Sequence, residues 1–504
     1  MACGAGGAAT QARSPAGASE SKPSGDNASP AGEPKGNDAL KGIAPAPAEC
    51  AKYASAPEQP CPPGDFNADL AKALMSVGSP DLALRCLEKA PEMPPGLMRA
   101  FSAELDRNCA DVIVGDSADA PGVPREISET LRALSVGARL FRSVRKPPLL
   151  QPPFSKAEFT KHFKEVLTPW IKEQVHAVDV LAQVGPRLSG YAKAIVALES
   201  GLADMRFVDI ARSIELPDEL KQDPELRETY LVSLEQALEP RVVRGRDAAL
   251  VGLGELQRQG ILKDSRLTEV RTLLSTLFAG RRIDALDQLL LPPLPAVELS
   301  TPALKIAAKL PAFYSLKLAT TPNVDDPQLL RARLEQGVPP ALWLSAPAPP
   351  ASPELAVLQQ RALFLLGQAY FWAEPFARAA AIATPKGDAP ATLVHELSKV
   401  LARGPRNAAA LMLGSTTLPA ELRDVTAVDA LAKQKSPAAG MAEFDAAYLR
   451  GLSPPANDPA FWKEQTLRYQ RAQKQLNDKD AKIAAELAKA AADTDKELRK
   501  QSKP

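Results

Sequence analysis

The chain has 504 residues, a formal net charge of +1 and 45% hydrophobic residues. Its 61 basic and 60 acidic residues nearly cancel, so the chain as a whole has no attraction for nucleic acid or an acidic membrane. It contains no run of about 18 apolar residues, the length that a membrane-spanning helix needs. Because only 5% of the residues are aromatic, we expect an aliphatic core.

Residues 1–64 are expected to form a disordered tether. From residue 4 onward this segment consists mainly of Ala, Gly, Ser, Pro, Lys and Glu, with almost no large apolar side chains. Such a composition cannot bury enough apolar surface to offset the entropy lost on ordering. Pro/Ala pieces such as 44–47 should make the tether partly extended.

The tether begins with Met1-Ala2-Cys3-Gly4. Ala-Cys-Gly followed by a flexible linker resembles the mature start of a bacterial lipoprotein, although the apolar leader of such a protein does not stand before Cys3 here. The resemblance implies a lipid on Cys3 and attachment to a membrane. Because Gly4 rather than Asp follows the cysteine, it implies retention in the outer membrane. The alternative is an ordinary cysteine near a start methionine.

The other four cysteines are Cys50, Cys61, Cys86 and Cys109. An even number within about sixty residues is typical of two disulfides in an oxidising compartment. Three pairings are possible. We favour Cys50–Cys61 with Cys86–Cys109, because each bond closes a short loop and the second would join two consecutive predicted helices. The alternative is buried free thiols in a cytosolic protein.

Beyond residue 64 the apolar periodicity is helical. The stripe from Ile127 to Phe141 advances in steps of four and three residues, which places it on one helix face. Few runs alternate with period two, so we predict no strand. Pro169 is expected to kink or break a helix that would otherwise continue. Similar stripes are formed by Phe159, Phe163, Val166 and Trp170, by Leu226, Tyr230, Leu234 and Leu238, and by Val270, Leu274 and Leu277.

Many of the 48 prolines are predicted to mark helix starts. Ser, Thr or Asp at the N-cap followed by Pro at the first helical position is the chemistry typical of such a start. These pairs, with one Val-Pro pair among them, are Ser79-Pro80, Val123-Pro124, Asp223-Pro224, Thr301-Pro302, Asp326-Pro327, Ser352-Pro353, Ser436-Pro437 and Asp458-Pro459.

Two segments share a helical-hairpin pattern. Residues 78–94 and 280–292 each begin with Gly, followed by Ala, Leu and Leu at the same offsets. This pattern resembles the turn and second helix of a tetratricopeptide-type repeat, and the segment containing Leu366, Gly367 and Ala379 resembles its first-helix signature and packing alanine. No regular 34-residue period occurs, so the resemblance implies irregular repeats. Convergent packing of helical hairpins is the alternative.

The predicted fold is therefore all-α, an array of antiparallel helical hairpins of the α-solenoid or TPR-like kind, with a disordered N-terminal tether. The final segment carries few large apolar residues and many charges, so we expect a solvated helix rather than a coiled coil. The predicted organisation is the tether (1–64), an N-terminal helical segment that disulfides would staple (65–146), a central helical domain (147–350), a C-terminal helical-repeat segment (351–476) and a charged helical tail (477–504).

One motif points to chemistry. Residues 197–201, Ala-Leu-Glu-Ser-Gly, resemble the Glu-Ser signature of lytic transglycosylases, helical envelope enzymes in which a lone Glu acts as acid and base. The resemblance implies peptidoglycan cleavage by Glu199, with its pKa raised by an apolar site. The rest of the family pattern is missing. In the alternative interpretation Glu199 lies on the polar face of a helix whose core residues are Ile195, Leu198, Leu202 and Met205.

The remaining patterns predict neither a cofactor nor a metal. His395-Glu396 begins like a zinc-protease helix, but Lys399 stands where the second histidine must be. Gly252-Leu-Gly254 lies inside a predicted helix, so it is not a dinucleotide loop. His162 and His176 are expected to be surface or interface residues. Two basic clusters, Arg139 to Lys146 and Arg241 to Arg246, are expected to complement helix ends, with anionic lipid or polysaccharide as the alternative partner of the first.

These observations predict a non-enzymatic interaction or scaffold protein of the cell envelope, periplasmic or anchored to the outer membrane through Cys3. Helical arrays bind protein or peptide partners on extended surfaces, and we expect no nucleic acid. A tether of about sixty residues would reach roughly 40–50 Å. The alternatives are a peptidoglycan-acting enzyme using Glu199 and a cytoplasmic helical scaffold.

Overall fold

The computed structural model describes eleven stretches of the chain, all within one compact unit, 36–504. Within them all regular structure is helical and no strand occurs, as predicted. Cys3, Cys61, Cys86 and the repeat-like segment 78–94 lie outside them. The described residues are 44–54, 95–145, 147–152, 155–216, 218–277, 286–296, 327–335, 352–404, 424–452, 454–455 and 457–502.

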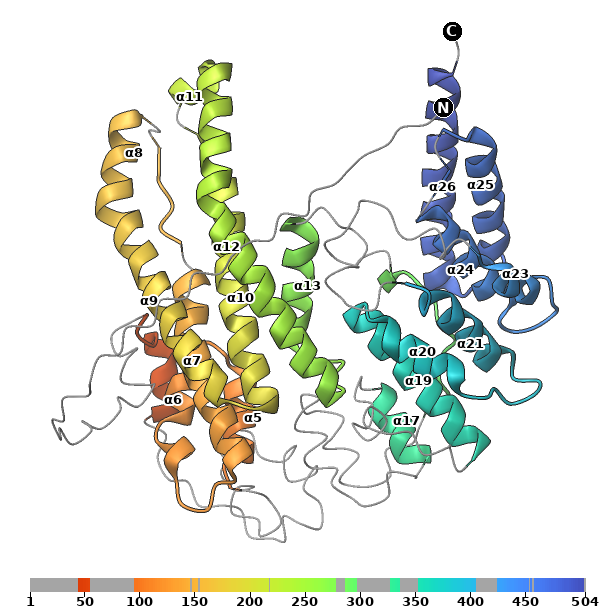
Figure 1. Ribbon diagram of the computed structural model, residues 1–504, viewed down its shortest axis with the longest axis horizontal. Coiled ribbons are helices and arrows are strands. Elements are labelled where there is room, and N and C mark those ends of the chain that lie inside the picture. Colours follow the sequence, from red (N-terminus) through yellow and green to blue (C-terminus); the bar gives the residue numbers. More distant parts are fainter. Residues whose placement is uncertain are drawn as a thin grey trace, which may run out of the picture. The chain divides into compact units, whose positions relative to one another are not determined.

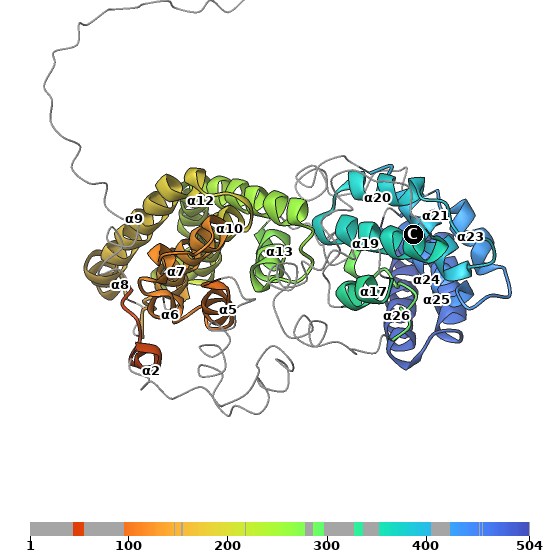
Figure 2. The same cartoon turned by 90° about the horizontal axis from the view of Figure 1, so that it is seen from below.

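The first group of helices lies between residues 51 and 277 (Figures 1 and 2). Short 3-10 turns at Ala48–Cys50, Ser117–Asp119 and Gly185–Arg187 and a π-helical turn at Phe163–Leu167 connect or extend its members. The helices are α2 (Ala51–Ala54), α5 (Leu97–Leu105), α6 (Ala110–Val114), α7 (Arg125–Arg145), α8 (Lys156–His162), α9 (Thr168–Val184), α10 (Gly190–Ser213), α11 (Asp218–Gln222), α12 (Pro224–Gln259) and α13 (Ser265–Leu277).

The second group follows in the C-terminal half of the chain. Its helices are α17 (Pro327–Glu335), α19 (Pro353–Tyr370), α20 (Ala373–Ala381), α21 (Ala389–Leu401), α23 (Thr426–Ala432), α24 (Ala439–Gly451), α25 (Pro459–Gln473) and α26 (Asp478–Gln501).

The predicted start chemistry is confirmed where the described residues include both positions. Asp223, Ser352 and Asp458 each occupy an N-cap with proline behind them, and their side chains accept hydrogen bonds from first-turn N–H groups. Two pairs are exceptions: α7 begins at Arg125, one residue after Pro124, and α24 begins at Ala439, two residues after Pro437. Pro169 does not break its helix, because the π-helical turn before it carries the chain from α8 into α9.

Helix α10 is the centre of the first group and is buried on most of its circumference. It packs on α12 at glycines that hold the two backbones together. A Cβ atom at Gly201 would lie 2.9 Å from both the N of Ala249 and the carbonyl O of Gly245. A Cβ at Gly252 would lie 2.5 Å from the Leu198 side chain. No larger residue fits these positions at the present helix separation.

A close contact of the same kind joins α19 and α20. A Cβ at Gly367 would lie 2.9 Å from the ring of Phe376, which also packs edge-on against Phe364. Ala379, the small residue expected at this contact, is fully buried.

The C-terminal tail packs more tightly than predicted. Ala484, Ala488 and Ala491 form a buried stripe on α26, which lies against α25 in both views (Figures 1 and 2). The small alanine side chains allow this close approach, so one face of the charged helix belongs to the core. On its exposed side, Asp495 and Arg499 form an ion pair at 2.7 Å.

Residues 44–54 correct the predicted extent of the tether. The Nε of Arg142 donates to the carbonyl O of Ala44, and the Ala44 N–H donates to Glu173. Cys50 is buried, and the Tyr53 hydroxyl donates to Asp106 at 2.9 Å. Composition alone missed these contacts because their partners lie far away in the sequence. No helix in the described ranges combines the length and apolar character of a membrane span.

Candidate functional site

Glu199 lies at the centre of a buried ion cluster. The side chain is only 2% exposed, which corrects its predicted place on a polar helix face. Its Oε1 accepts hydrogen bonds from Nη2 of Arg107 at 2.6 Å and from Nε of Arg266 at 2.8 Å. The predicted core neighbours Leu198 and Leu202 are indeed buried. Glu199 thus ties α10 to the α5–α6 connection and to α13.

The electrostatics hold Glu199 in its ionised form. Burial by itself would raise the pKa of this carboxyl, but the charges of Arg107, Arg266 and Arg206 together bring it below the usual value. A general acid for glycan cleavage needs the opposite, a carboxyl that keeps its proton near neutral pH. The arrangement therefore suits a structural ion pair and not proton donation.

A second carboxylate shares the arginine. Arg266 donates from Nη1 to Glu104 at 2.7 Å, and its backbone N–H donates to Asp264. Burial raises the pKa of Glu104 in spite of the Arg266 charge, and its Oε2 has no hydrogen-bond partner among the described residues. The Tyr191 hydroxyl donates to Asp264 at 2.8 Å. Glu104 is therefore the member of this cluster that is most easily protonated.

A cavity of about 470 Å³ opens beside this cluster. Arg107 lies against its wall with its guanidinium 4.4 Å from the ring centre of Phe141. Arg145 and Lys263 add positive charge, while Asp106, Glu104 and Asp264 add negative charge. Because both signs line the cavity, it does not select an anion or a cation by charge alone.

The described cysteines correct the favoured pairing. Cys50 is bonded to Cys109, with an S–S distance of 2.03 Å. The preference for short loops failed because residues 44–54 pack against the α5–α6 connection, which brings Cys50 to Cys109. Of the two alternative pairings, this bond is compatible only with the one that joins Cys61 to Cys86, which lie outside the described residues.

The first basic cluster supports that docked segment. Arg142 is buried and makes a two-pronged ion pair with Asp111, at 2.7 Å for each contact. It also donates to the carbonyl O of Asn108, beside the disulfide. In the second cluster, Arg241 and Arg244 both bind Asp204, which is fully buried. Arg142 lies in the last turn of α7, as expected, and also satisfies a buried carboxylate, whereas Arg241 and Arg244 lie inside α12 and satisfy Asp204 instead of complementing a helix end.

The histidines form no metal centre in the described part of the chain, where no group of three or more His, Cys, Asp and Glu side chains could hold an ion. His162 Nε2 lies 3.1 Å from the carbonyl O of Pro148. His395 contacts the amide of Gln360 from α21. Burial and the nearby Lys399 lower the pKa of His395, so this imidazole is neutral at pH 7.

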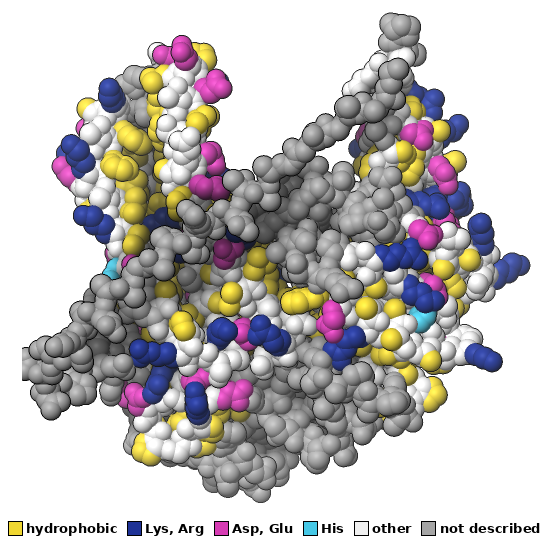
Figure 3. Space-filling model, viewed as in Figure 1, with side chains coloured by type: hydrophobic (Ala, Val, Ile, Leu, Met, Phe, Trp, Pro, Cys, Tyr) yellow, Lys and Arg dark blue, Asp and Glu magenta, His cyan; other side chains and the backbone are white. Residues whose placement is uncertain are grey.

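Exposed apolar side chains gather on two helical segments. Phe163 and Val166, on the π-helical turn, are 47% and 42% exposed. Leu226, Leu231 and Val232, at the start of α12, are 43–52% exposed; of the predicted apolar stripe there, Leu226 is exposed and Leu238 is buried. Figure 3 shows apolar side chains along α8 and along the first half of α12. We call these five residues the apolar rim.

A cavity of about 220 Å³ lies beside Phe163, one member of the apolar rim. Phe159, Phe163 and Leu167 line one part of it, and Leu149 and Ile214 line another. This arrangement of a small apolar hollow next to exposed apolar side chains is typical of a surface that binds another chain.

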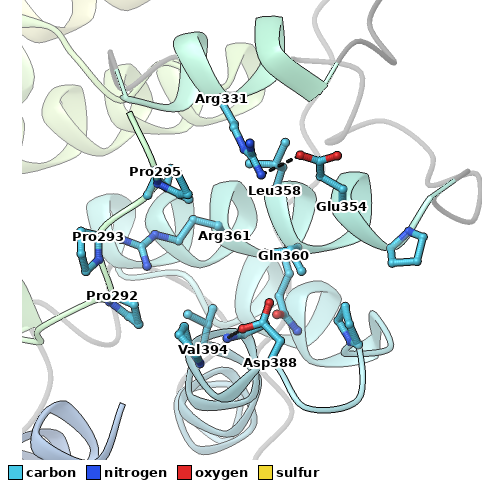
Figure 4. A pocket seen from close by; sticks show the side chains of 16 residues that line it. Pro292, Pro293, Pro295, Arg331, Glu354, Leu358, Gln360, Arg361, Asp388 and Val394 are labelled. Carbon is cyan, nitrogen blue, oxygen red and sulfur yellow. Dashed lines mark hydrogen bonds and ion pairs between the residues drawn. The ribbon is translucent and has the colours of Figure 1, made fainter. Parts of the chain in front are cut away.

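A further pocket of about 400 Å³ lies in the C-terminal half (Figure 4). Segment 292–295 and helices α17, α19 and α21 supply its walls, and Arg361 extends from α19 toward Pro293. Sequence reasoning missed this arginine, although it is the only basic residue between Pro353 and Tyr370. Its position as a lone basic residue was the feature of the sequence that could have identified it as a functional candidate.

No family model, curated protein or solved structure matches this chain.

Proposed function

We propose that this chain is a non-enzymatic interaction protein of the cell envelope, an array of antiparallel helical hairpins carried on an N-terminal tether. The observation that carries the interaction role is the apolar rim. Leaving Phe163, Leu231 and their neighbours in water is costly, and burial recovers about 25 cal/mol for each Å² covered. A protein or peptide partner with an apolar face is the occupant that this surface fits.

The Cys50–Cys109 bond supports the compartment. Disulfides persist in the periplasm and outside cells, whereas the cytosol keeps thiols reduced. An oxidising compartment also agrees with the proposed lipid attachment at Cys3. In this proposal the tether holds the helical array near a membrane and lets it search for its partner.

The enzyme alternative gains no support from Glu199. Its carboxylate is ionised, buried and bonded to two arginines, so it has neither the proton nor the access that glycan cleavage requires. We therefore propose no catalytic residue.

Site-specific photocrosslinking in the native host tests the interaction role. A photoreactive amino acid replaces Leu231 or Phe163, and a matched variant carries it at Lys489, an exposed position on α26. We expect one discrete adduct from the two rim positions and none from Lys489. The adduct from Phe163 should disappear when Leu231→Glu and Val232→Glu are added. Absence of a rim adduct, or the same adduct from all three positions, would contradict the proposal.

Thiol mapping tests the compartment separately. Protein from the native host is alkylated under denaturing, non-reducing conditions and digested. We expect a linked peptide pair that contains Cys50 and Cys109. Recovery of both residues as alkylated free thiols would remove the argument for an envelope location and leave the apolar rim unaffected.

A further inference from the structure

We propose that the pocket lined by segment 292–295, α17, α19 and α21 binds a small organic carboxylate with an apolar body, and that Arg361 is its counter-ion. This site lies apart from the apolar rim and does not depend on the function proposed above.

Arg361 carries a positive charge that no carboxylate in the pocket neutralises by an ion pair. The Nε of Arg361 is buried and has no hydrogen-bond partner among the described residues. Its guanidinium also forms no ion pair with any of them. Burial lowers the pKa of Arg361 to about 10, so the side chain still carries its proton at pH 7. The pocket therefore holds a half-buried positive charge, with a buried Nε, that has no carboxylate partner among the described residues, an arrangement that is costly in an isolated protein.

The two carboxylates in the pocket wall are already engaged. Glu354 pairs with Arg331 at 2.6 Å, as the dashed line in Figure 4 marks. Asp388 is the N-cap of α21 and accepts a hydrogen bond from the Ala391 N–H at 2.9 Å. Glu354 is thus paired with another cation and Asp388 caps a helix, so Arg361 is the lining cation without a carboxylate partner among the described residues.

The shape and walls of the pocket define the ligand. A volume of about 400 Å³ falls in the usual range for small-molecule sites. Six of the lining residues are prolines: Pro292, Pro293, Pro295, Pro353, Pro385 and Pro390. Proline rings are rigid and apolar and have no N–H to donate, so much of the wall offers contact area without hydrogen bonds.

Arg361, the lining cation without a carboxylate partner in the described part of the chain, sets the charge of the ligand. A guanidinium can donate two parallel hydrogen bonds to the two oxygens of a carboxylate. A phosphate monoester carries nearly two charges and needs more donors than one arginine and a proline-rich wall supply. A monocarboxylate attached to a ring or a short alkyl chain satisfies both the charge and the apolar wall.

Calorimetric titration of the full chain tests the site. The probes are benzoate, 3-phenylpropionate and octanoate, each paired with its uncharged amide. We expect at least one acid to bind about tenfold more tightly than its amide, the ratio that 1.4 kcal/mol corresponds to. Arg361→Gln should abolish that preference. The control Arg331→Gln, on the same wall, should retain it, because Arg331 is already paired with Glu354.

A stability measurement keeps the test independent of folding defects. Without ligand, Arg361→Met should melt at a higher temperature than the parent, because it removes the uncompensated charge. Saturating 3-phenylpropionate should raise the melting temperature of the parent and not that of Arg361→Met. Equal binding of acids and amides, no binding of any probe, or a large loss of stability in Arg361→Met would each overturn the proposal.

Discussion

Nη2 of Arg107 lies 2.6 Å from Oε1 of Glu199, and this contact joins the α5–α6 connection to the centre of α10. Because Arg266 binds the same oxygen, one buried carboxylate compensates two buried cations. Removing it would take one buried partner from each guanidinium group, Arg107 keeping Glu269 and Arg266 keeping Glu104, and this is more costly than losing a pair on the surface.

We therefore expect Glu199→Gln to lower the free energy of unfolding by about 3–5 kcal/mol at pH 7. The folded-state pKa of Glu199 is lowered, so its stabilisation is present above the unfolded pKa near 4.3 and is lost as the pH falls through the folded value. Urea unfolding from pH 7 downward should show the two proteins converging at low pH. The control Glu374→Gln, on the exposed pair with Arg378, should cost less than about 1 kcal/mol.

Gly201→Ala should destabilise the α10–α12 contact by about 1–3 kcal/mol, because the new Cβ would meet backbone atoms of α12. Thermal unfolding checks this. Gly254→Ala is the matched control, since a Cβ there approaches only the end of the Arg258 side chain, at 3.6 Å. Helix propensity should make that variant more stable by up to about 1 kcal/mol. A stabilising Gly201→Ala would show that the helices do not pack at this distance.

Asp445→Asn should stabilise the protein at neutral pH. Asp445 is fully buried, its Oδ1 accepts the Leu290 N–H, and its Oδ2 has no hydrogen-bond partner among the described residues. Burial raises the pKa of this carboxyl well above its usual value, although the Leu290 N–H opposes the rise. A raised acid pKa means that the folded state binds more protons than the unfolded state, so stability falls as the pH rises above about 4.

The amide cannot ionise and should remove this fall. We expect a gain of about 1–3 kcal/mol at pH 7 that shrinks toward zero near pH 4, measured by urea unfolding at several pH values. A pH-independent loss of stability would instead mean that the carboxyl accepts a hydrogen bond that the amide cannot replace.

Replacing Cys50 and Cys109 by serine should lower stability by about 2–4 kcal/mol under oxidising conditions. The physical reason is that the bond limits the freedom of the unfolded chain over a separation of 59 residues. Added reductant should lower the stability of the parent, because it breaks this bond. The double variant lacks the bond, so reductant should not lower its stability through these two positions. The matched control is Cys3→Ser, which should have the stability of the parent.

The sequence predicted the structural features that depend only on contacts between residues close together in the chain. The apolar stripe from Ile127 to Phe141 forms the buried face of α7, and Asp223 caps α12 as its Asp-Pro pair indicated. Both features need contacts only within a turn or two of helix, so local spacing determines them.

Long-range pairing was not predictable in this way. Glu199 meets Arg107 across 92 positions and Arg266 across 67, and nothing in the helical period around Glu199 specifies those partners. The same holds for the Cys50–Cys109 bond. Gly201 was part of a sequence resembling a catalytic signature, but its role is close helix packing. The sequence therefore identified the residues, but only the fold determines which residues they contact.

The Cys50–Cys109 bond has a mechanical consequence for any anchor at the N-terminal end. A pull on that end reaches Cys50 and crosses to Cys109 through the sulfur bridge, so residues 51–108 carry no load. Arg142 then spreads the force into α7. Reduction would place those residues in the path between that end and Cys109. The oxidation state of a single covalent bond therefore decides whether a pull on the N-terminal end bypasses residues 51–108 or runs through them.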